Sequence, residues 1–230
     1  MRSPSSVRPF ALLAVATVAA FAHAAAQSDS QQSATRAQFL HQLVAAAVER
    51  THHVVRYDPA YVRIPYPNGD VPADSGVCTD EIIRSYRAVG IDLQKEVHED
   101  MQQNFSAYPR KWHWMLTGAD ASIDHRRVPN LMVFFSRKGE TLKISSDSAD
   151  YSPGDLVTWD LGGNVPHIGI LVDQASEHAG GIGVALERTV KIPVLLVQEG
   201  AAFIGGGEIR SHDIVGPAVV ADLGHRRRPA

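Results

Sequence analysis

The chain has 230 residues, a formal net charge of -3 and a single cysteine. Hydrophobic residues make up 44% of it and charged residues 20%, which excludes a disordered chain and is typical of a globular protein. A dedicated nucleic-acid binder usually carries a strong basic excess, so we expect no nucleic-acid partner. The length allows one domain of moderate size.

The N-terminus has the pattern of a cleaved secretory signal. Arg2 and Arg8 precede an apolar run at residues 10–21, and small, mostly alanine residues follow at 22–26. The run is shorter than the roughly 20 apolar residues that a membrane span needs. Residues 1–26 are therefore predicted to be a signal peptide. We expect a periplasmic or secreted protein without stable membrane insertion.

The rest of the chain is interpreted as one domain between two polar ends. Residues 27–34 are predicted to be a disordered lead-in, residues 35–222 a single domain, and residues 223–230 a solvated basic tail. The domain opens with a helix from Thr35 to about His52, because its apolar residues recur at helical spacing. Helices come first and short strands between turn residues follow, which predicts an α+β fold with an antiparallel sheet.

The single cysteine, Cys78, stands at the predicted start of a helix that ends near Gly90. Asp74 and Ser75 precede it as N-cap candidates. In a first helical turn, unpaired backbone N–H groups and the helix dipole favour a thiolate. An exported chain with one cysteine forms no internal disulfide. The position therefore predicts a nucleophile, while a small buried hydrophobe is the alternative that position alone leaves open.

A cysteine nucleophile needs a histidine as base and a third group that orients the imidazole. His167 opens an apolar strand and shares one strand face with Gly169, which leaves that face open near the cysteine helix. Gln198 follows another apolar run, and its amide oxygen can accept from the imidazole. Glu199 points to the opposite strand face and is the alternative. We expect a Cys78–His167 pair with Gln198 as its third member.

A polar loop at residues 123–130 contains Asp124, His125 and Arg126. Either Arg126 or Arg127 can hold a carboxylate there, and the aspartate and histidine can orient a substrate or ligate a metal. A salt-bridged structural loop is equally compatible with this pattern. We assign Asp124, His125 and Arg126 to substrate binding, and we expect no cofactor and no resident metal.

Eight motifs, in order, resemble one bacterial exported family. They are YPNGDVP at residues 66–72, GVCTD at 76–80, RSYR at 84–87, GIDLQ at 90–94, VHEDM at 97–101, IDHRRVPNL at 123–131, YSPGDLV at 151–157 and HIGI at 167–170. The family is the one catalogued as domain of unknown function 1287, and the resemblance extends from about Thr35 to Val220. This family is similar in turn to the NlpC-type, papain-like cell-wall cysteine peptidases.

The resemblance implies a papain-like α+β fold in which the nucleophile helix packs on an antiparallel sheet. It implies Cys78 as nucleophile and His167 as base. The family usually carries a His-Asn pair where this chain has Gln198 and Glu199, and NlpC-type enzymes accept glutamine as the third group. A tyrosine upstream of the cysteine often supports the oxyanion in those enzymes, and Tyr66 resembles it by placement.

Asp80, two residues after the cysteine, completes the substrate-binding residues that we expect. The combined expectation is an exported cysteine hydrolase that cleaves an amide bond in a peptidoglycan peptide. One alternative is a cell-envelope module that binds muropeptides without turnover, and another is an acyltransferase that uses the same Cys–His pair. Peptidoglycan or a muropeptide is the expected partner, and the oligomeric state stays open.

Overall fold

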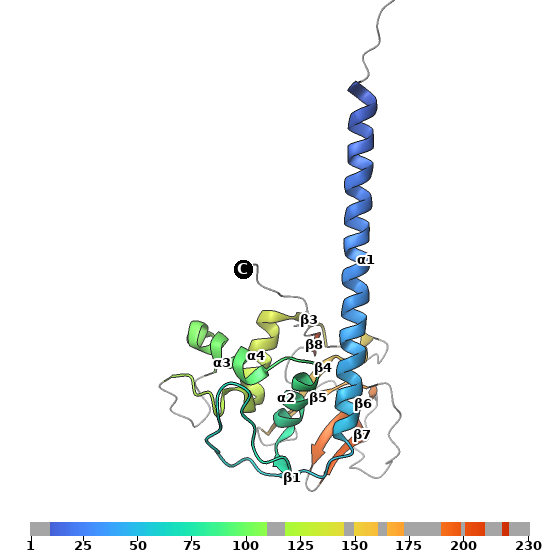
Figure 1. The fold of residues 1–230 in the computed structure, drawn as a ribbon. Coiled ribbons are helices and arrows are strands. Elements are labelled where there is room, and N and C mark those ends of the chain that lie inside the picture. The colour runs from blue at the N-terminus through green and yellow to red at the C-terminus, as the bar shows by residue number, and fades with distance from the viewer. Residues whose placement is uncertain are drawn as a thin grey trace, which may run out of the picture. The chain divides into compact units, whose positions relative to one another are not determined.

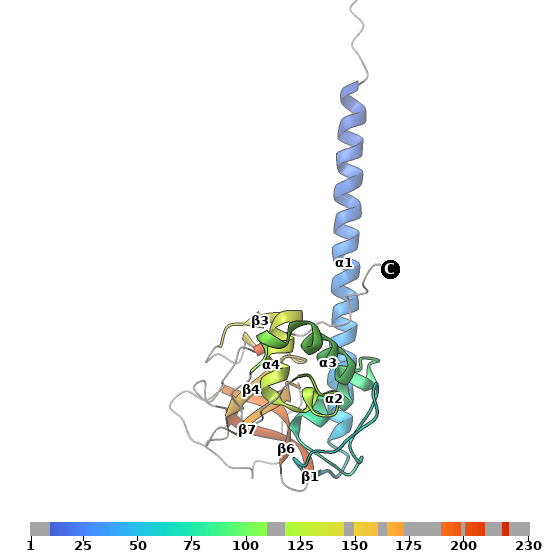
Figure 2. The ribbon, with the colours of Figure 1, turned by 90° about the vertical axis from the view of Figure 1, so that its left-hand side faces the viewer.

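A computed structural model describes residues 10–109, 118–144, 150–160, 165–172, 190–198, 201–209 and 218–220, with side chains placed between residues 26 and 172 of these ranges. The chain divides into two units, Met1–Gln38 and Phe39–Ala230. Helices and strands follow one another in the order that Figures 1 and 2 show, so the predicted α+β class is confirmed.

Four helices and two 3-10 turns form the helical part of the described chain. They are α1 (Phe10–Arg50), α2 (Cys78–Ala88), α3 (Leu93–Asn104), η1 (Phe105–Ala107), η2 (Asp124–Arg126) and α4 (Val128–Lys138). Residues 27–34 belong to α1, so the segment predicted to be a disordered lead-in is helical instead. Extending an alanine-rich helix costs less than nucleating a new one, which accounts for this difference. Within the described residues, none of these helices has the length and apolar character of a membrane span.

The strands form three small sheets within the described residues. A parallel pair joins β1 (Arg56–Tyr57) to β2 (Ser75–Gly76), and an antiparallel pair joins β6 (Val190–Gln198) to β7 (Ala201–Ile209). The largest sheet is antiparallel and has the order β3 (Glu140–Leu142), β8 (Ala218–Val220), β4 (Leu156–Asp160), β5 (Pro166–Ile170). The antiparallel pairing agrees with the sequence-based prediction.

The hydrophobic core lies between the helices and one face of the β4–β5 pair. Its largest members are Ile82, Ile83 and Tyr86 of α2, Leu131, Phe134 and Phe135 of α4, and Ile168 and Ile170 of β5. Because side chains alternate along a strand, His167 lies on the β5 face opposite Ile168. The core residues of the helices pack with Ile168 and Ile170, and the expected approach of His167 to the cysteine helix stays a prediction.

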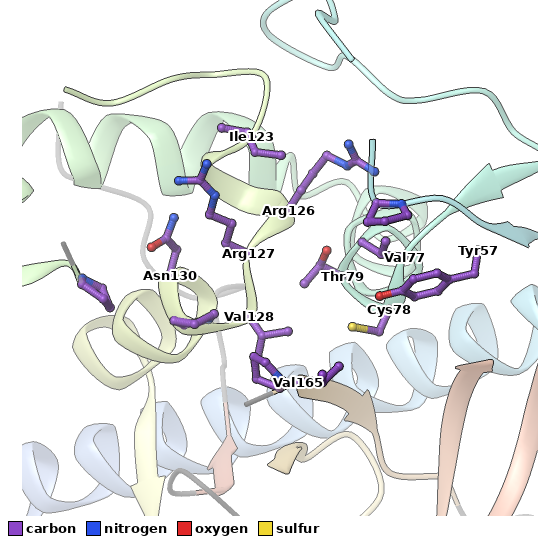
Figure 3. Close-up of a pocket in the computed structure, with 14 residues that line it drawn as sticks. Tyr57, Val77, Cys78, Thr79, Ile123, Arg126, Arg127, Val128, Asn130 and Val165 are labelled. Atoms are coloured by element: carbon purple, nitrogen blue, oxygen red, sulfur yellow. The ribbon is translucent and has the colours of Figure 1, made fainter. Parts of the chain in front are cut away.

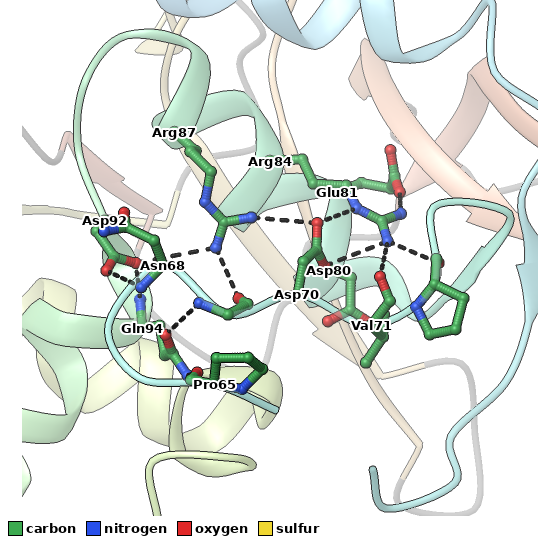
Figure 4. A network of polar contacts seen from close by, with 12 residues as sticks. Pro65, Asn68, Asp70, Val71, Asp80, Glu81, Arg84, Arg87, Asp92 and Gln94 are labelled. Atoms are coloured by element: carbon green, nitrogen blue, oxygen red, sulfur yellow. Dashed lines mark hydrogen bonds and ion pairs between the residues drawn. The ribbon is translucent and has the colours of Figure 1, made fainter. Parts of the chain in front are cut away.

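A buried ionic network holds the loop that leads into α2 (Figure 4). Arg84 donates to Glu81 at 2.6 Å and to Asp70 at 3.0 Å, and its guanidinium also reaches the carbonyls of Val71, Pro72 and Ser75. Glu81, with a side chain 1% exposed, also accepts from Arg50 at 2.6 Å. A planar guanidinium with five donors can satisfy several acceptors at once. The network therefore fixes the approach to the cysteine.

A second buried carboxylate, Asp100 of α3, joins three segments. It accepts from Tyr108 at 2.7 Å, from Arg137 at 2.8 Å and from Lys138 at 2.9 Å. Burial by itself raises the pKa of Asp100, but these hydrogen bonds outweigh burial and lower the pKa to about 2. Asp100 therefore stabilises the packing of α3 against the end of α4.

The lowered pKa of Asp100 predicts a pH-dependent contribution to stability. The contribution is present above the usual aspartate pKa of 3.8 and is lost as the pH falls toward about 2. Asp100→Asn should lower the free energy of unfolding by about 2 kcal/mol at pH 7, and by progressively less below pH ~4. Urea unfolding across this pH range measures the difference. Asp74→Asn, at an exposed carboxylate, is the control; a constant gap for D100N would contradict the prediction.

Candidate functional site

A cavity of about 270 Å³ lies at the N-terminus of α2. Valines, isoleucine and prolines form most of its wall (Figure 3). The groups that can bind or react are Tyr57, Cys78, Thr79, Arg126, Arg127 and Asn130. Small-molecule sites are typically apolar cavities with a few convergent polar groups. This cavity, at the one cysteine of the chain, is the candidate site.

Cys78 is the first residue of α2, as predicted, but its cap differs from the predicted one. The N-cap is Val77, and the Asp80 side chain accepts from the Val77 amide at 2.7 Å. Asp74 and Ser75 are the N-cap candidates of the sequence, and this prediction is wrong. The Asp80 carboxylate, at the third position of the helix, accepts from the amide of the N-cap residue Val77 instead. The cap places the Cys78 side chain at the cavity.

The Cys78 thiol is buried, with 5% of the residue exposed. Burial raises its pKa to about 11, and the nearby Asp80 carboxylate adds to this. The backbone N–H groups of Ile168, Thr79 and Cys78 favour the thiolate, but they do not outweigh burial. The expectation that the helix start lowers the pKa of the thiol is therefore wrong for this state of the protein. At neutral pH the thiol is protonated.

Tyr57 lies next to the thiol and was missed by sequence reasoning. It belongs to β1, whose parallel pairing with β2 sets Tyr57 opposite Gly76, two residues before the cysteine. Figure 3 shows the Tyr57 ring beside Cys78 at the cavity. Burial raises the pKa of Tyr57, and the neighbouring Cys78 and Asp80 raise it further. The phenol is therefore a neutral hydrogen-bond donor at the site.

A buried ion pair beneath the cavity joins two segments that were assigned separately to substrate binding. Arg126 donates to Asp80 through two nitrogens, at 2.8 and 3.0 Å, and both side chains are 2% exposed. The guanidinium also donates to the carbonyls of Ala60 at 3.0 Å and Asp58 at 3.4 Å. Burial raises the pKa of Asp80, and the Arg126 hydrogen bonds oppose that rise. Asp80 and Arg126 therefore make their main hydrogen bonds to each other and to neighbouring backbone groups of the protein.

Asp124 and His125 are buried beside this pair, but neither lines the cavity. Asp124 Oδ2 accepts from the Asp120 amide at 2.8 Å and from His98 Nδ1 at 2.9 Å, while Gln102 donates to His98 Nε2 at 2.9 Å. Burial lowers the pKa of His125 to about 3, with a further contribution from Arg126, so its imidazole is neutral. These contacts correspond to the structural-loop alternative that the sequence left open.

His167 follows a residue of the cavity wall in the chain, but its own side chain is not among the lining groups. The ring stacks on Trp159, its cross-strand neighbour, with centroids 5.7 Å apart. Its neighbour Pro166 lines the cavity, and the Ile168 amide donates to the Cys78 thiol. Among the described residues, no hydrogen bond joins Cys78 to His167. Burial lowers the pKa of His167, so this imidazole is also neutral.

Two predicted site residues remain. Tyr66 is 42% exposed, donates to Glu99 at 3.4 Å and packs edge-on against His98, so it lies outside the cavity lining. Gln198 ends β6, a strand close to β5 and α2, and its side chain lies outside the described residues. Glu199, the alternative, lies outside them altogether.

Thr79, Arg127 and Asn130 complete the polar wall of the cavity. Thr79 is 0% exposed and its hydroxyl has no hydrogen-bond partner. Asn130 donates to the Asp124 carbonyl at 2.9 Å, which holds its amide in place. Sequence reasoning weighed Arg127 only as an alternative to Arg126 and did not consider the other two. No local pattern identifies them, because helix α4 and η2 meet the start of α2 only in the tertiary structure.

In the described ranges, no cluster of three or more histidine, cysteine or carboxylate side chains has an arrangement that would hold a metal ion. The polar groups of the cavity are instead donors: a phenol, a hydroxyl, two guanidinium groups and an amide. Such a set favours an uncharged carbonyl or an anionic ligand.

Fold and cavity together define an α+β protein with one thiol at a helix N-terminus. A family model described as Domain of unknown function (DUF1287) matches residues 44–186, more than half of the chain, so the chain belongs to that family. It is similar to the Uncharacterized protein YijF of Escherichia coli (strain K12), with 52% identity over 117 residues. The match covers 51% of this chain and 56% of that relative, little more than half its length. No solved structure matches the chain.

Removing Arg126 should strongly destabilise the protein, because Asp80 would remain buried without its partner. Arg126→Met is expected to lower the free energy of unfolding by about 3–5 kcal/mol. The matched control is Arg56→Met, since Arg56 is 69% exposed and pairs with Asp58 at the surface. That change should cost less than about 1 kcal/mol. Equal losses in urea unfolding would contradict the structural role of the Asp80–Arg126 pair.

Burial of Cys78 predicts slow alkylation of the native protein. The rate with iodoacetamide should still rise about tenfold per pH unit up to pH ~9.5, because only the thiolate reacts. In denaturant the same thiol should react with a midpoint near pH ~8.5. The chain has one cysteine, so the unfolded protein is an internal control. A native rate that levels off below pH 8 would show that the thiol is not held neutral.

Proposed function

We propose that this protein is an exported cysteine hydrolase that cleaves an amide bond in a peptidoglycan peptide. The observation that carries the proposal is the lone cysteine at the first position of α2, open to a cavity and surrounded by hydrogen-bond donors. The likeness of the family to NlpC-type cell-wall peptidases supplies the reaction class. The signal-like N-terminus supplies the location, periplasmic or secreted, where peptidoglycan is found.

The proposed reaction begins at the Cys78 sulfur. As the sulfur attacks the scissile carbonyl carbon, its proton passes to His167, and the C–N bond then breaks while the imidazolium returns the proton to the leaving amine. Water hydrolyses the resulting thioester and restores the thiol. A neutral thiol of raised pKa makes a base essential, and burial keeps the His167 imidazole unprotonated, as a base must be.

This role requires His167 to move. Its ring stacks on Trp159, whereas its backbone is next to Ile168, the residue whose amide meets the thiol. In this proposal a rearrangement at the start of β5, with the ring released from Trp159, brings base and nucleophile together. Gln198, at the end of nearby β6, then holds the imidazole in its new position, as papain-like enzymes do with a third residue.

Two groups are proposed to stabilise the oxyanion. The backbone N–H of Cys78 is one, because first-turn amides have no acceptor within the helix. Tyr57, and not Tyr66, is the tyrosine that we propose as the second oxyanion donor, since Tyr57 lies beside the thiol and Tyr66 does not line the cavity. In the same proposal Asp80 and Arg126 act on the substrate only indirectly, by fixing the helix start and the segment after Tyr57.

A binding module without turnover is the second candidate. The raised pKa of Cys78 and the stacking of His167 on Trp159 favour it, because both describe an inactive arrangement. Such a protein would hold a muropeptide in the same cavity. It would bind purified cell-wall fragments without altering them.

Incubation of the mature protein with purified sacculi separates the two candidates. The wild type should release soluble peptide fragments, and Cys78→Ala should reduce the rate by several orders of magnitude if the thiol acts covalently. His167→Gln should lose most of the rate too. Tyr66→Phe is the control, because Tyr66 lies outside the cavity lining. Equal release by wild type and C78A would refute the hydrolase, and binding of fragments without release would establish the module.

A further inference from the structure

We propose that the cavity beside Cys78 holds an aliphatic subsite, a place for an uncharged aliphatic residue of a peptide substrate. Its residues are Thr79, Ile123, Val128 and Val165. The aliphatic subsite deepens the proposed function, because it names the kind of residue that adjoins the scissile amide. It rests on that function only for the peptide nature of the substrate, since the preference for an uncharged aliphatic group follows from the cavity itself.

The wall of the aliphatic subsite is apolar and stiff. Val128 is 5% exposed and Ile123 8%, whereas Val165 is 44% exposed, so the cavity runs from an open rim to a buried apolar wall. Figure 3 shows Ile123 and Val128 beside η2 and the start of α4, with Thr79 and Cys78 on α2 opposite them. Side chains branched at Cβ have few rotamers, and the remaining wall is rich in proline. Such a wall binds an aliphatic group without first having to become ordered.

The cavity is small for a ligand site. Its volume of about 270 Å³ lies just below the roughly 300–1,000 Å³ that are typical of small-molecule sites. A short aliphatic side chain with its own peptide unit suits such a space, whereas several consecutive residues do not. The wall therefore selects one residue of the substrate.

The Thr79 hydroxyl supplies the polar contact of the aliphatic subsite. Thr79 is 0% exposed, lines the cavity and has no hydrogen-bond partner for its Oγ1. Two neighbouring polar groups of the wall bond within the protein, Arg126 to Asp80 and Asn130 to the Asp124 carbonyl. A buried hydroxyl without a partner costs free energy, which a ligand in the cavity restores. A hydroxyl both donates and accepts, and a peptide unit offers an uncharged carbonyl and an N–H in return.

The Cys78 sulfur shows which charge this space tolerates. A thiolate is an anion at the cavity, and burial together with Asp80 raises the pKa of the thiol to about 11. A ligand carboxylate next to the sulfur would lose its water and meet Asp80 in the same way. Burial also lowers the pKa of Arg127, while Asp124 and Asp120 oppose that fall, so its charge already acts on two carboxylates. An uncharged residue avoids these costs.

Alkylation of Cys78 by three iodoacetamides of similar shape tests the aliphatic subsite without turnover. N-isobutyl iodoacetamide ends in two methyl groups, iodoacetylglycine ends in a carboxylate, and iodoacetylglycinamide ends in a neutral amide. Each rate at pH ~8.5 is divided by the rate of the same reagent on the urea-unfolded protein, in which the same thiol has no cavity. This corrected rate should be about tenfold higher for the isobutyl compound than for the glycinamide. The glycine compound should react no faster than the glycinamide.

Two variants identify the contacts. Val128→Thr exchanges a wall methyl group for a hydroxyl, so it should lower the corrected rate of the isobutyl compound about threefold and leave the glycinamide unchanged. Val133→Thr is the matched control, because Val133 also belongs to α4 but does not line the cavity. Thr79→Val should slow all three reagents about fivefold, because each has the amide that bonds the hydroxyl. Its control is Thr158→Val, at a buried threonine without a hydrogen-bond partner that lies outside the cavity lining.

Three results would overturn the aliphatic subsite: equal corrected rates for the three reagents, a carboxylate reagent that reacts faster than its amide, or unaltered rates in T79V. The reagent comparison needs only the wild type, so it decides even where a variant does not fold. The sacculus assay can fail while the isobutyl compound still reacts faster. The hydrolase and its aliphatic subsite are therefore tested separately.

Discussion

The bidentate pair between Asp80 and Arg126 is the interaction on which the candidate site depends. Both side chains are buried, and the same two residues also hold three backbone groups: the Val77 amide at the start of α2 and the carbonyls of Ala60 and Asp58. Without it, neither the cysteine nor the segment that follows Tyr57 has a fixed position relative to η2. The cost of burying two charges is offset because both carboxylate oxygens and all three guanidinium nitrogens make hydrogen bonds. The ion pair therefore fixes the start of α2 and η2 relative to each other at the cavity.

The surroundings of Cys78 have opposing effects on the pKa of its thiol. A helix N-terminus and three backbone amides favour the Cys78 thiolate, while burial and the Asp80 carboxylate raise its pKa to about 11. The carboxylate that caps the helix thus also disfavours charge on the sulfur. Papain-like chemistry on this scaffold would need the thiol to lose its proton during attack rather than before it, with His167 released from Trp159. Substrate entry is the natural trigger for such a rearrangement in the proposed mechanism, because it changes the surroundings of both groups.

The polar loop after residue 120 contains residues with two different roles: some make hydrogen bonds inside the protein, and others line the cavity. Asp124 bonds His98 of α3 inside the protein, whereas Arg127 and Asn130, from the same short loop as Asp124, line the cavity. Both kinds of residue are polar and close in sequence. The difference arises from the sharp direction changes of η2 and the start of α4, which turn neighbouring side chains to opposite sides. The family match covers this stretch as well as the cysteine and the His167 strand.

The sequence alone determined the α+β class, the start of α2 at Cys78, the antiparallel pairing of the sheet and the family. These follow from local periodicity, turn residues and motifs, which act over a few residues and can be read along the chain. Only the tertiary structure decided which tyrosine meets the thiol, which carboxylate pairs with Arg126 and which side of β5 packs in the core with the helices. Those outcomes depend on packing between distant segments: β1 beside β2, η2 under α2, and Ile168 rather than His167 against the core. Burial also set the protonation of Cys78, because the cost of desolvating a charge is a property of the folded surroundings and not of the helix position.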